Sequence, residues 1–183
     1  MDAVVAPDGW LNDKVVDAVN SLVAKKIGSD QNQSTLLAQI PNGFAAIGTE
    51  AVHVLHSQNH WVATACIGNE VLYADSMSND KNVNDFVARQ MKQLYGGLLD
   101  PDTRKLQVTI VPSAKQTNGA DCGIYATAVA FEWATGNQKL PLAWDIPAMR
   151  AHLKTCLEGQ TVKRFKVTGG RRGRRPRPVK VFV

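Results

Sequence analysis

Apolar residues near the start of the chain recur at the spacing of an amphipathic helix. Within residues 14–27 they fall on one helical face, with Asn12 or Asp13 available to cap the start and Gly28 to end the helix. The stretch STLLAQIP that follows at 34–41 fits a helix or a strand equally well. The pattern therefore predicts one amphipathic helix ahead of an ambiguous segment.

Between residues 51 and 75 the pattern changes to short runs rich in β-forming residues. The runs AVHVLH, WVATACI and VLYAD are separated by turn formers, and GNE between the last two has the composition of a tight hairpin turn. Residues 106–112, LQVTIVP, alternate apolar and polar positions. These patterns predict three adjacent strands and a further strand later in the chain.

Helical periodicity returns in residues 82–96, 122–135 and 146–158. The second of these helices is apolar around most of its circumference, so we expect it at the centre of the core. The third has Asp145 as its N-cap and Pro147 in its first turn. Helices and strands are mixed while the strands cluster, which indicates an α+β fold.

The charge of the chain is distributed unevenly. The 183 residues carry a net charge of +5, but the segment from Lys163 onward holds nine Lys or Arg residues and no acid. The remainder has 12 basic and 16 acidic residues, a net charge of −4. We therefore expect one globular domain over residues 1–160 and a basic, flexible tail over residues 161–183.

This basic tail indicates either a nuclear-localisation signal or nonspecific contact with an anionic partner such as nucleic acid. No aromatic residue lies between the arginines of GGRRGRRPRP, so stacking on bases is not indicated. Phosphate contacts would be electrostatic and therefore sensitive to salt.

The composition of the chain also indicates where in the cell the protein is located. No apolar run approaches the roughly 20 residues that cross a bilayer, and MDAVVAPDGW lacks the basic and apolar regions of a signal peptide. The three cysteines are widely spaced and form no C-x-x-C pair. We expect free thiols, a nuclear or cytoplasmic location, no membrane association, no metal or other cofactor, and a monomer.

Cys122 lies where a polar, glycine-containing loop meets the most apolar helix. The N-terminus of a helix stabilises a thiolate, because its N–H groups are unpaired and its dipole is positive there. A cysteine at such a position is also ordinary core material. The choice between nucleophile and core residue therefore depends on partners elsewhere in the chain.

Three residues provide such partners. His60 opens a predicted strand, and the following hairpin returns the chain to Asp75, where a carboxylate would fix the tautomer of the imidazole. Gln116 lies six residues before Cys122, and its amide would donate to an oxyanion together with the Cys122 N–H. Taken singly, Asp75 also fits a turn cap and Gln116 a solvated loop residue.

Other titratable residues favour structural roles. His53 and His56 fall on opposite faces of a strand, so they do not converge on a metal ion. Cys66 lies in the middle of a strand and Cys156 in the last helix. We interpret both cysteines as structural.

The ordered motifs resemble those of the ubiquitin-like-protein-specific cysteine proteases, which include SUMO and NEDD8 deconjugating enzymes and viral and transposon-encoded relatives. The resemblance covers about residues 10–133. It is carried by GWLND at 9–13, HW at 60–61, DS at 75–76 and QTNGADCG at 116–123. It implies a compact papain-like or adenain-like domain, with a central mixed β-sheet flanked by helices and the nucleophile at the N-terminus of a buried helix.

The same resemblance assigns roles to individual residues. Cys122 would be the nucleophile, His60 the general base and acid, Asp75 the orienting carboxylate and Gln116 an oxyanion donor. Trp10 and Trp61 would line a narrow tunnel that clamps a Gly-Gly tail of the substrate. The matching residues Asn12, Asp13 and Asp121 fit capping and scaffold roles.

The implied activity is cleavage after the Gly-Gly-type tail of a ubiquitin-like modifier. Only nine residues precede Trp10, and the segment before His60 is compact, whereas these regions hold the folded substrate in longer family members. Three alternatives stay open: a virus- or transposon-encoded protease that cuts Gly-containing sites in precursors, a non-catalytic module that binds ubiquitin-like tails or nucleic acid, and an acyltransferase that reuses the triad.

Overall fold

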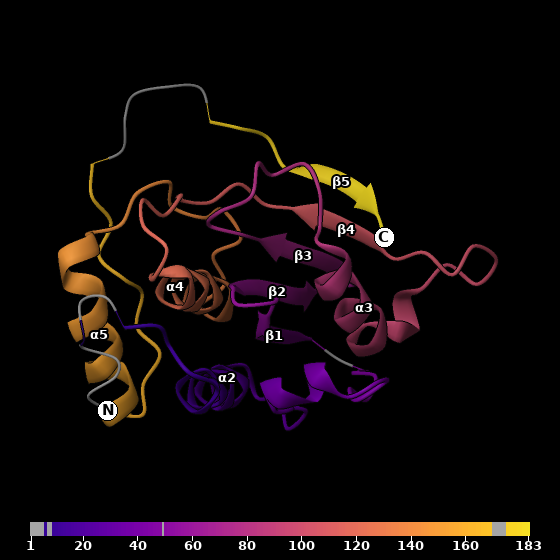
Figure 1. Ribbon diagram of the computed structural model, residues 1–183, viewed down its shortest axis with the longest axis horizontal. Coiled ribbons are helices and arrows are strands. Elements are labelled where there is room, and N and C mark those ends of the chain that lie inside the picture. The colour runs from indigo at the N-terminus through magenta and orange to yellow at the C-terminus, as the bar shows by residue number, and fades with distance from the viewer. Residues whose placement is uncertain (1–5, 7–8, 49, 170–174) are drawn as a thin grey trace.

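The computed structural model describes residues 6, 9–48, 50–169 and 175–183. The chain enters through helix α2 (Asp13–Ile27), which Asn12 caps by accepting the Val15 N–H at 3.0 Å, and which ends at Gly28 in the left-handed conformation. The ambiguous segment forms the short 3-10 helix η1 (Thr35–Gln39). The helix and its caps are thus confirmed (Figure 1).

A mixed five-stranded sheet forms the centre of the molecule. Strands β1 (Ala51–His56), β2 (Trp61–Ile67) and β3 (Glu70–Ala74) are antiparallel neighbours, as expected. The chain then passes through α3 (Asp85–Leu94) and η2 (Gly96–Leu98) and returns as β4 (Gln107–Ile110), which runs parallel to β3.

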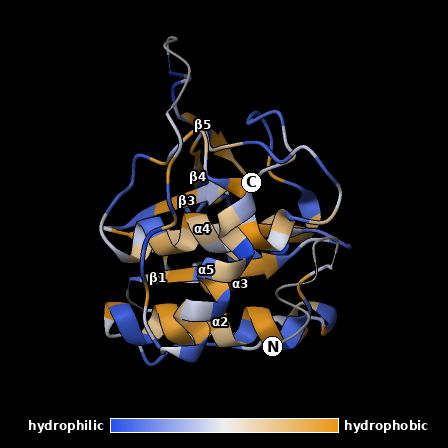
Figure 2. Ribbon diagram, turned by 90° about the vertical axis from the view of Figure 1, so that its left-hand side faces the viewer, coloured by the Kyte–Doolittle hydropathy of each residue, from blue (hydrophilic) through white to orange (hydrophobic). Residues whose placement is uncertain are grey.

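Helices cover both faces of this sheet. On one face α2, α4 (Cys122–Ala134) and α5 (Ile146–Glu158) share a core with alternate strand residues such as Val54, Ala63 and Leu72. On the other face α3 packs against the intervening residues, among them Val62 and Tyr73. The α+β expectation is confirmed, and Figure 2 shows the hydrophobic colours gathered on the strands and on α4.

Every residue of α4 is buried, as its apolar circumference predicts. Its first turn lies close to the segment that precedes α2, with no space between Gly123 and Leu11. A Cβ on Gly123 would lie 2.9 Å from the Cβ of Leu11. Glycine at this position is therefore what allows the helix that begins at Cys122 to approach the N-terminal segment.

We expect Gly123→Ala to lower the free energy of unfolding by about 1–2 kcal/mol, since the clash outweighs the better helix propensity of alanine. Urea unfolding measures this change. Gly119→Ala is the matched control, because a Cβ there meets nothing within 4 Å. Equal unfolding midpoints for the two variants would show that the close approach of Gly123 to Leu11 does not affect stability.

The segment 161–183, expected as a flexible tail, packs against the domain in the parts that the structure describes. Phe165 is 3% exposed and its ring lies 5.6 Å from that of Phe131. Val167 forms a β-bridge with Trp144, and strand β5 (Val179–Phe182) pairs antiparallel with β4. These contacts join the described parts of residues 161–183 to the domain, while the basic residues 171, 172 and 174 lie outside the described part of the chain.

Two predicted caps act differently from expectation. Asp145 precedes α5 but its carboxylate pairs with Lys166 at 3.0 Å instead of accepting a helix N–H. Asp121 precedes α4 and is likewise not a side-chain cap, because its carboxylate accepts from Arg150 at 2.6 Å and from Asn118 at 2.7 Å. Ion pairing satisfies both carboxylates better than a helix N–H would.

Within the described residues, no helix has the length and apolar character needed to cross a membrane.

Candidate active site

The histidine of the candidate site is positioned by the turn between β1 and β2. His56 pairs with Trp61, and the Ser57 N–H donates to the His60 carbonyl at 2.6 Å. The two central residues, Gln58 and Asn59, have φ of 43° and 67°. Positive φ at both positions is the type I′ geometry that matches the twist of a hairpin, so the turn holds His60 rigidly at the start of β2.

The neighbouring strand supplies the carboxylate. Asp75 follows β3 and is buried, and its Oδ1 lies 2.7 Å from Nε2 of His60. The Met77 N–H donates to the same oxygen at 2.8 Å, and the Tyr73 hydroxyl donates to Oδ2 at 3.0 Å. These donors lower the pKa of Asp75 against the opposing effect of burial. The predicted approach of Asp75 to His60 is therefore present in the structure.

The electrostatics of His60 follow from these neighbours. Burial alone lowers the pKa of an imidazole, but the hydrogen bond and negative charge of Asp75, together with the neighbouring Cys122, raise the pKa of His60 to about 9. Because a carboxylate only accepts, Nε2 carries a proton and donates it to Asp75. Nδ1 makes no hydrogen bond to the described residues, so the neutral ring keeps a lone pair for a thiol proton.

Cys122 is the first residue of α4 and its side chain is buried in the core cluster. Since neither Asp121 nor another side chain caps this helix, the first-turn N–H groups and the positive end of the dipole lie beside the sulfur. Cys122 is also one of the neighbours that raise the pKa of His60. The arrangement supports formation of a thiolate–imidazolium pair.

Gln116 lies in the loop before α4 and its amide is held at both ends. Oε1 accepts from the Ser76 hydroxyl, and Nε2 donates to the Asn118 carbonyl at 2.6 Å. Asn118 Oδ1 in turn accepts the N–H groups of Ala120 at 2.9 Å and Asp121 at 3.0 Å, which orders the loop up to Cys122. The predicted oxyanion donor is thus fixed in place on the loop that leads to Cys122.

The two tryptophans lie on one cavity of about 220 Å³, which Leu36, His56 and Asn59 also line. Trp10 is 49% exposed, whereas Trp61 is 6% exposed and its Nε1–H donates to the Leu11 carbonyl at 2.9 Å. Trp61 is therefore held in the core and lines the cavity as well. The exposed face of Trp10 is available to a ligand.

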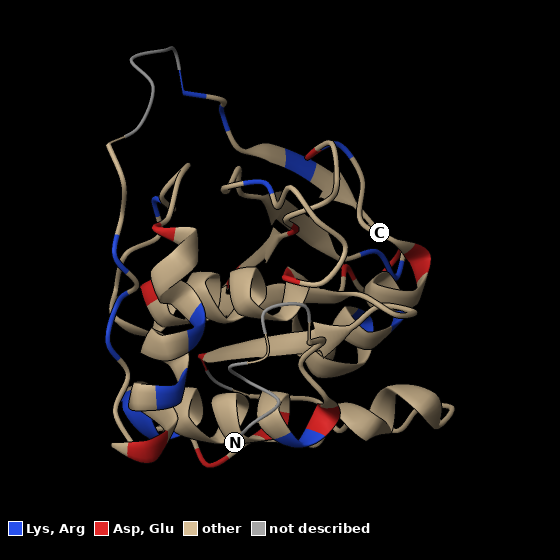
Figure 3. Cartoon of the chain, turned by 60° about the vertical axis from the view of Figure 1, so that its left-hand side comes forward, with Lys and Arg blue, Asp and Glu red and all other residues tan. Residues whose placement is uncertain are grey.

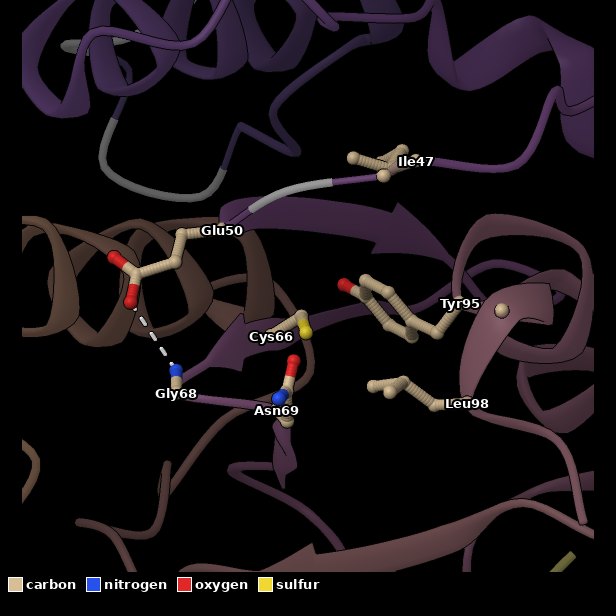
Figure 4. A pocket seen from close by; sticks show the side chains of 9 residues that line it. Ile47, Glu50, Cys66, Gly68, Asn69, Tyr95 and Leu98 are labelled. Carbon is tan, nitrogen blue, oxygen red and sulfur yellow. Dashed lines mark hydrogen bonds between the residues drawn. The ribbon is translucent and has the colours of Figure 1, made fainter.

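A second cavity of about 500 Å³ lies at the opposite end of the β2–β3 hairpin and contains Cys66 (Figure 4). Burial and the negative charge of Glu50 raise the pKa of the Cys66 thiol. Figure 4 shows Tyr95, Asn69 and Glu50 around this thiol and no histidine. This environment fits the structural role predicted for Cys66.

Cys156 does have a histidine nearby, which the sequence interpretation missed. Its sulfur lies 3.4 Å from Nε2 of His152, one helical turn away on α5. The same nitrogen lies 2.8 Å from the Lys163 carbonyl, so it must carry a proton to donate there. A protonated nitrogen does not accept a thiol proton, and burial raises the pKa of Cys156. The pair is therefore structural.

Three further residues support the site and were not singled out from the sequence. They are Tyr73, which donates to Asp75, Ser76, which donates to Gln116, and Lys115, whose Nζ donates to the Asp75 carbonyl at 2.8 Å and pairs with Asp80 at 2.5 Å. Only the position of Ser76 in the DS motif was a signal in the sequence. Tyr73 and Lys115 become neighbours of the carboxylate only in the folded chain.

A cysteine at a helix start, a histidine at a strand start and a carboxylate on the adjoining strand, all on an α+β fold, define the class of cysteine proteases. The sequence profile described as "Ulp1 protease family, C-terminal catalytic domain" matches residues 52–155, which is more than half of the chain. The chain belongs to this family and is a cysteine-type peptidase.

Solved structures show the same fold at low sequence identity. The C-terminal Ulp1 protease domain in complex with Smt3, the yeast ortholog of SUMO, is 17% identical with a TM-score of 0.56, covering 86% of this chain and 80% of that chain. The catalytic domain of the Chaetomium thermophilum Ulp1-like SUMO protease is 17% identical with a TM-score of 0.58, covering 87% and 76%. No curated protein matches the chain in sequence.

Proposed function

We propose that this peptidase cleaves after the Gly-Gly-type tail of a ubiquitin-like modifier through a triad of Cys122, His60 and Asp75. The observation that carries the proposal is the Asp75–His60 hydrogen bond of 2.7 Å beside a cysteine at the start of α4. Support for the substrate comes from the Ulp1 domain whose structure contains Smt3.

The geometry suggests a step-by-step chemistry. Nδ1 of His60 takes the thiol proton, and the Cys122 sulfur attacks the carbonyl carbon after glycine. The oxyanion accepts from the Cys122 N–H and from Gln116, and the imidazolium then returns its proton to the leaving amine. Water, deprotonated by His60, hydrolyses the thioester and regenerates the thiol.

The cavity lined by Trp10 and Trp61 supports selectivity for glycine. Its volume of about 220 Å³ is below the usual range for ligand pockets, and both tryptophans line it. A narrow passage between rings admits a backbone without side chains and excludes larger residues. Gly-Gly therefore fits where a bulkier dipeptide would clash.

We expect SUMO, NEDD8 or ubiquitin carrying a C-terminal electrophile to form a covalent adduct with Cys122, detected by intact mass and peptide mapping. A matched SUMO probe whose tail ends in Ala-Ala is the control and should react at least about 10-fold more slowly, given the steric exclusion. If iodoacetamide labels Cys122 while no modifier probe and no short Gly-terminated probe does, the proposed specificity fails.

The same experiment separates the nearest alternative. A processing protease of viral or transposon type would react with short Gly-containing probes and leave whole modifiers unmodified. Adduct formation with a whole modifier, at a higher rate than with its isolated tail peptide, supports the deconjugation or maturation proposal.

We also propose that the basic C-terminal segment makes nonspecific contact with nucleic acid, which is consistent with a nuclear location. Figure 3 shows Lys and Arg recurring along the described part of this segment. Positive charge continues from it onto α2, because Lys25, Lys26 and Lys163 line one hollow of about 420 Å³. None of the three lysines has an ion pair among the described residues.

Duplex DNA should bind with an affinity that falls roughly 100-fold between 50 and 200 mM salt if about four phosphates are neutralised. Lys26→Glu should weaken binding and reduce the salt slope by about one. Lys14→Glu, at the other end of the same helix, is the control. Fluorescence anisotropy measures the binding. Equal affinities of the two variants for DNA would show that α2 is not part of the DNA-binding surface.

A further inference from the structure

Two loops that carry different parts of the active site are fastened to each other. The loop 75–80 follows β3 and the loop 113–121 precedes α4. The Gln116 N–H donates to the Ser76 carbonyl at 3.1 Å, and Lys115 Nζ donates to the Asp75 carbonyl at 2.8 Å. The Ser76 hydroxyl then donates to Gln116 Oε1. The side chain of Ser76 is thus the link that reaches the amide itself.

The two contacts of the Gln116 amide fix which end is oxygen and which is nitrogen. The Asn118 carbonyl only accepts, so the group that faces it at 2.6 Å must be the NH₂. The oxygen therefore faces Ser76, whose hydroxyl donates to it. One Nε2 hydrogen is used by Asn118, and the amide retains a second hydrogen for another acceptor.

We propose that Ser76 is a positioning residue for oxyanion stabilisation: its hydroxyl holds the amide plane of Gln116 so that the remaining Nε2 hydrogen is directed at the developing oxyanion. This inference rests on the role proposed above for Gln116. Ser76 is 6% exposed, so water does not readily replace the hydroxyl as a donor. The adjacent residues Asp75 and Ser76 thereby orient the base and the oxyanion donor, respectively.

The physical basis is preorganisation. An oxyanion donor acts fully only if it is already aimed at the place where charge develops, and removal of one such donor costs roughly 10²–10³ in kcat. Loss of the Ser76 hydroxyl leaves the Gln116 amide held only through its contact with the Asn118 carbonyl, so its plane is less well fixed. The expected cost is therefore smaller than removal of the amide, about 10- to 100-fold in kcat.

The test compares Ser76→Ala with Gln116→Ala in steady-state hydrolysis of a modifier–fluorophore substrate. Ser76→Ala should lower kcat by about 10- to 100-fold with KM within about 2-fold, since substrate binding does not use the oxyanion donor. Ser76→Thr keeps the hydroxyl and should restore most of kcat. Alkylation of Cys122 by iodoacetamide forms no oxyanion, so its rate and pH dependence should stay those of the unsubstituted protein in Ser76→Ala.

A double-mutant cycle separates a positioning role from a structural one. If Ser76 acts through Gln116, Ser76→Ala should have almost no effect on kcat in the Gln116→Ala background. An equal loss in both backgrounds, or slowed alkylation in Ser76→Ala, would overturn the inference and indicate an effect on Cys122 and His60. Normal kcat in Ser76→Ala alongside a defective Gln116→Ala would overturn it while the proposed function stands. Normal kcat in Gln116→Ala would instead refute the proposed role of Gln116.

Discussion

Cys122→Ser is expected to reduce kcat/KM by at least about 10⁴-fold while the fold and the binding of the modifier are retained. Serine has nearly the size of cysteine, so the buried position at the start of α4 stays filled. Its hydroxyl is far less acidic than a thiol and is not converted to an anion by a histidine built to pair with a thiolate. Hydrolysis of a fluorogenic modifier conjugate measures the loss, and calorimetric titration measures binding.

The matched control is Cys156→Ser, which also replaces a buried sulfur beside a histidine. We expect this variant to keep its activity within about 3-fold, because His152 already donates to the Lys163 carbonyl. Retention of more than a tenth of the activity by Cys122→Ser, or a comparable loss in Cys156→Ser, would contradict the assignment of the nucleophile.

Asp75→Asn is expected to lower kcat by about 10²- to 10⁴-fold and to move the alkaline limb of the pH profile to lower pH. The pKa of His60 is raised to about 9 by Asp75 and Cys122, so the imidazolium of the active ion pair persists until about pH 9 in the unsubstituted protein. The amide of asparagine has no charge to stabilise that imidazolium. Loss of the negative charge of Asp75 therefore lowers the pKa of His60. The pH dependence of kcat/KM between pH 5 and 10 is the measurement.

Tyr73→Phe provides the graded control for this prediction. It removes one donor at 3.0 Å from the Asp75 carboxylate but leaves the charge next to His60. The alkaline limb should therefore stay near pH 9 in this variant. An alkaline limb that does not move in Asp75→Asn would show that the carboxylate does not control the protonation of His60.

The protonation of His60 also makes the folding stability of the protein depend on pH. A pKa raised from 6.5 to about 9 in the folded protein means that protonated His60 favours folding. This contribution is fully present below pH 6.5 and is lost as pH rises through about 9. His60→Gln should abolish that part of the pH dependence of Tm.

The local patterns of the sequence predicted most of the domain. Helix α2, strands β1 to β4 and the apolar helix α4 follow from periodicity, because their neighbours in space impose the same burial that the sequence encodes. The approach of Asp75 to His60 was predictable as well, since one hairpin connects them. The roles of Cys122 and Gln116 depended on the ordered motifs, because no local pattern brings a distant helix to a strand end.

Strand β5 was missed for a physical reason. The alternation in PVKVFV is short, and the arginines before it give the whole segment the composition of a solvated tail. Its pairing partner β4 lies far away in the chain, so only the tertiary structure provides the edge it joins. The contacts of Asp121 and Asp145 escaped prediction similarly, because Arg150 and Lys166 compete with the helix N–H groups only after folding.

The hairpin of β2 and β3 also has a consequence for the order in which the site assembles. His60 and Asp75 are 15 residues apart and meet through adjacent strands, whereas α4 must dock from a distant part of the chain. Closing a short loop costs less entropy than closing a long one, so local pairs form earlier during folding. The acid–base pair is therefore expected to assemble before the sulfur reaches it, and a nascent or partly folded chain carries no activated thiol that could attack its neighbours.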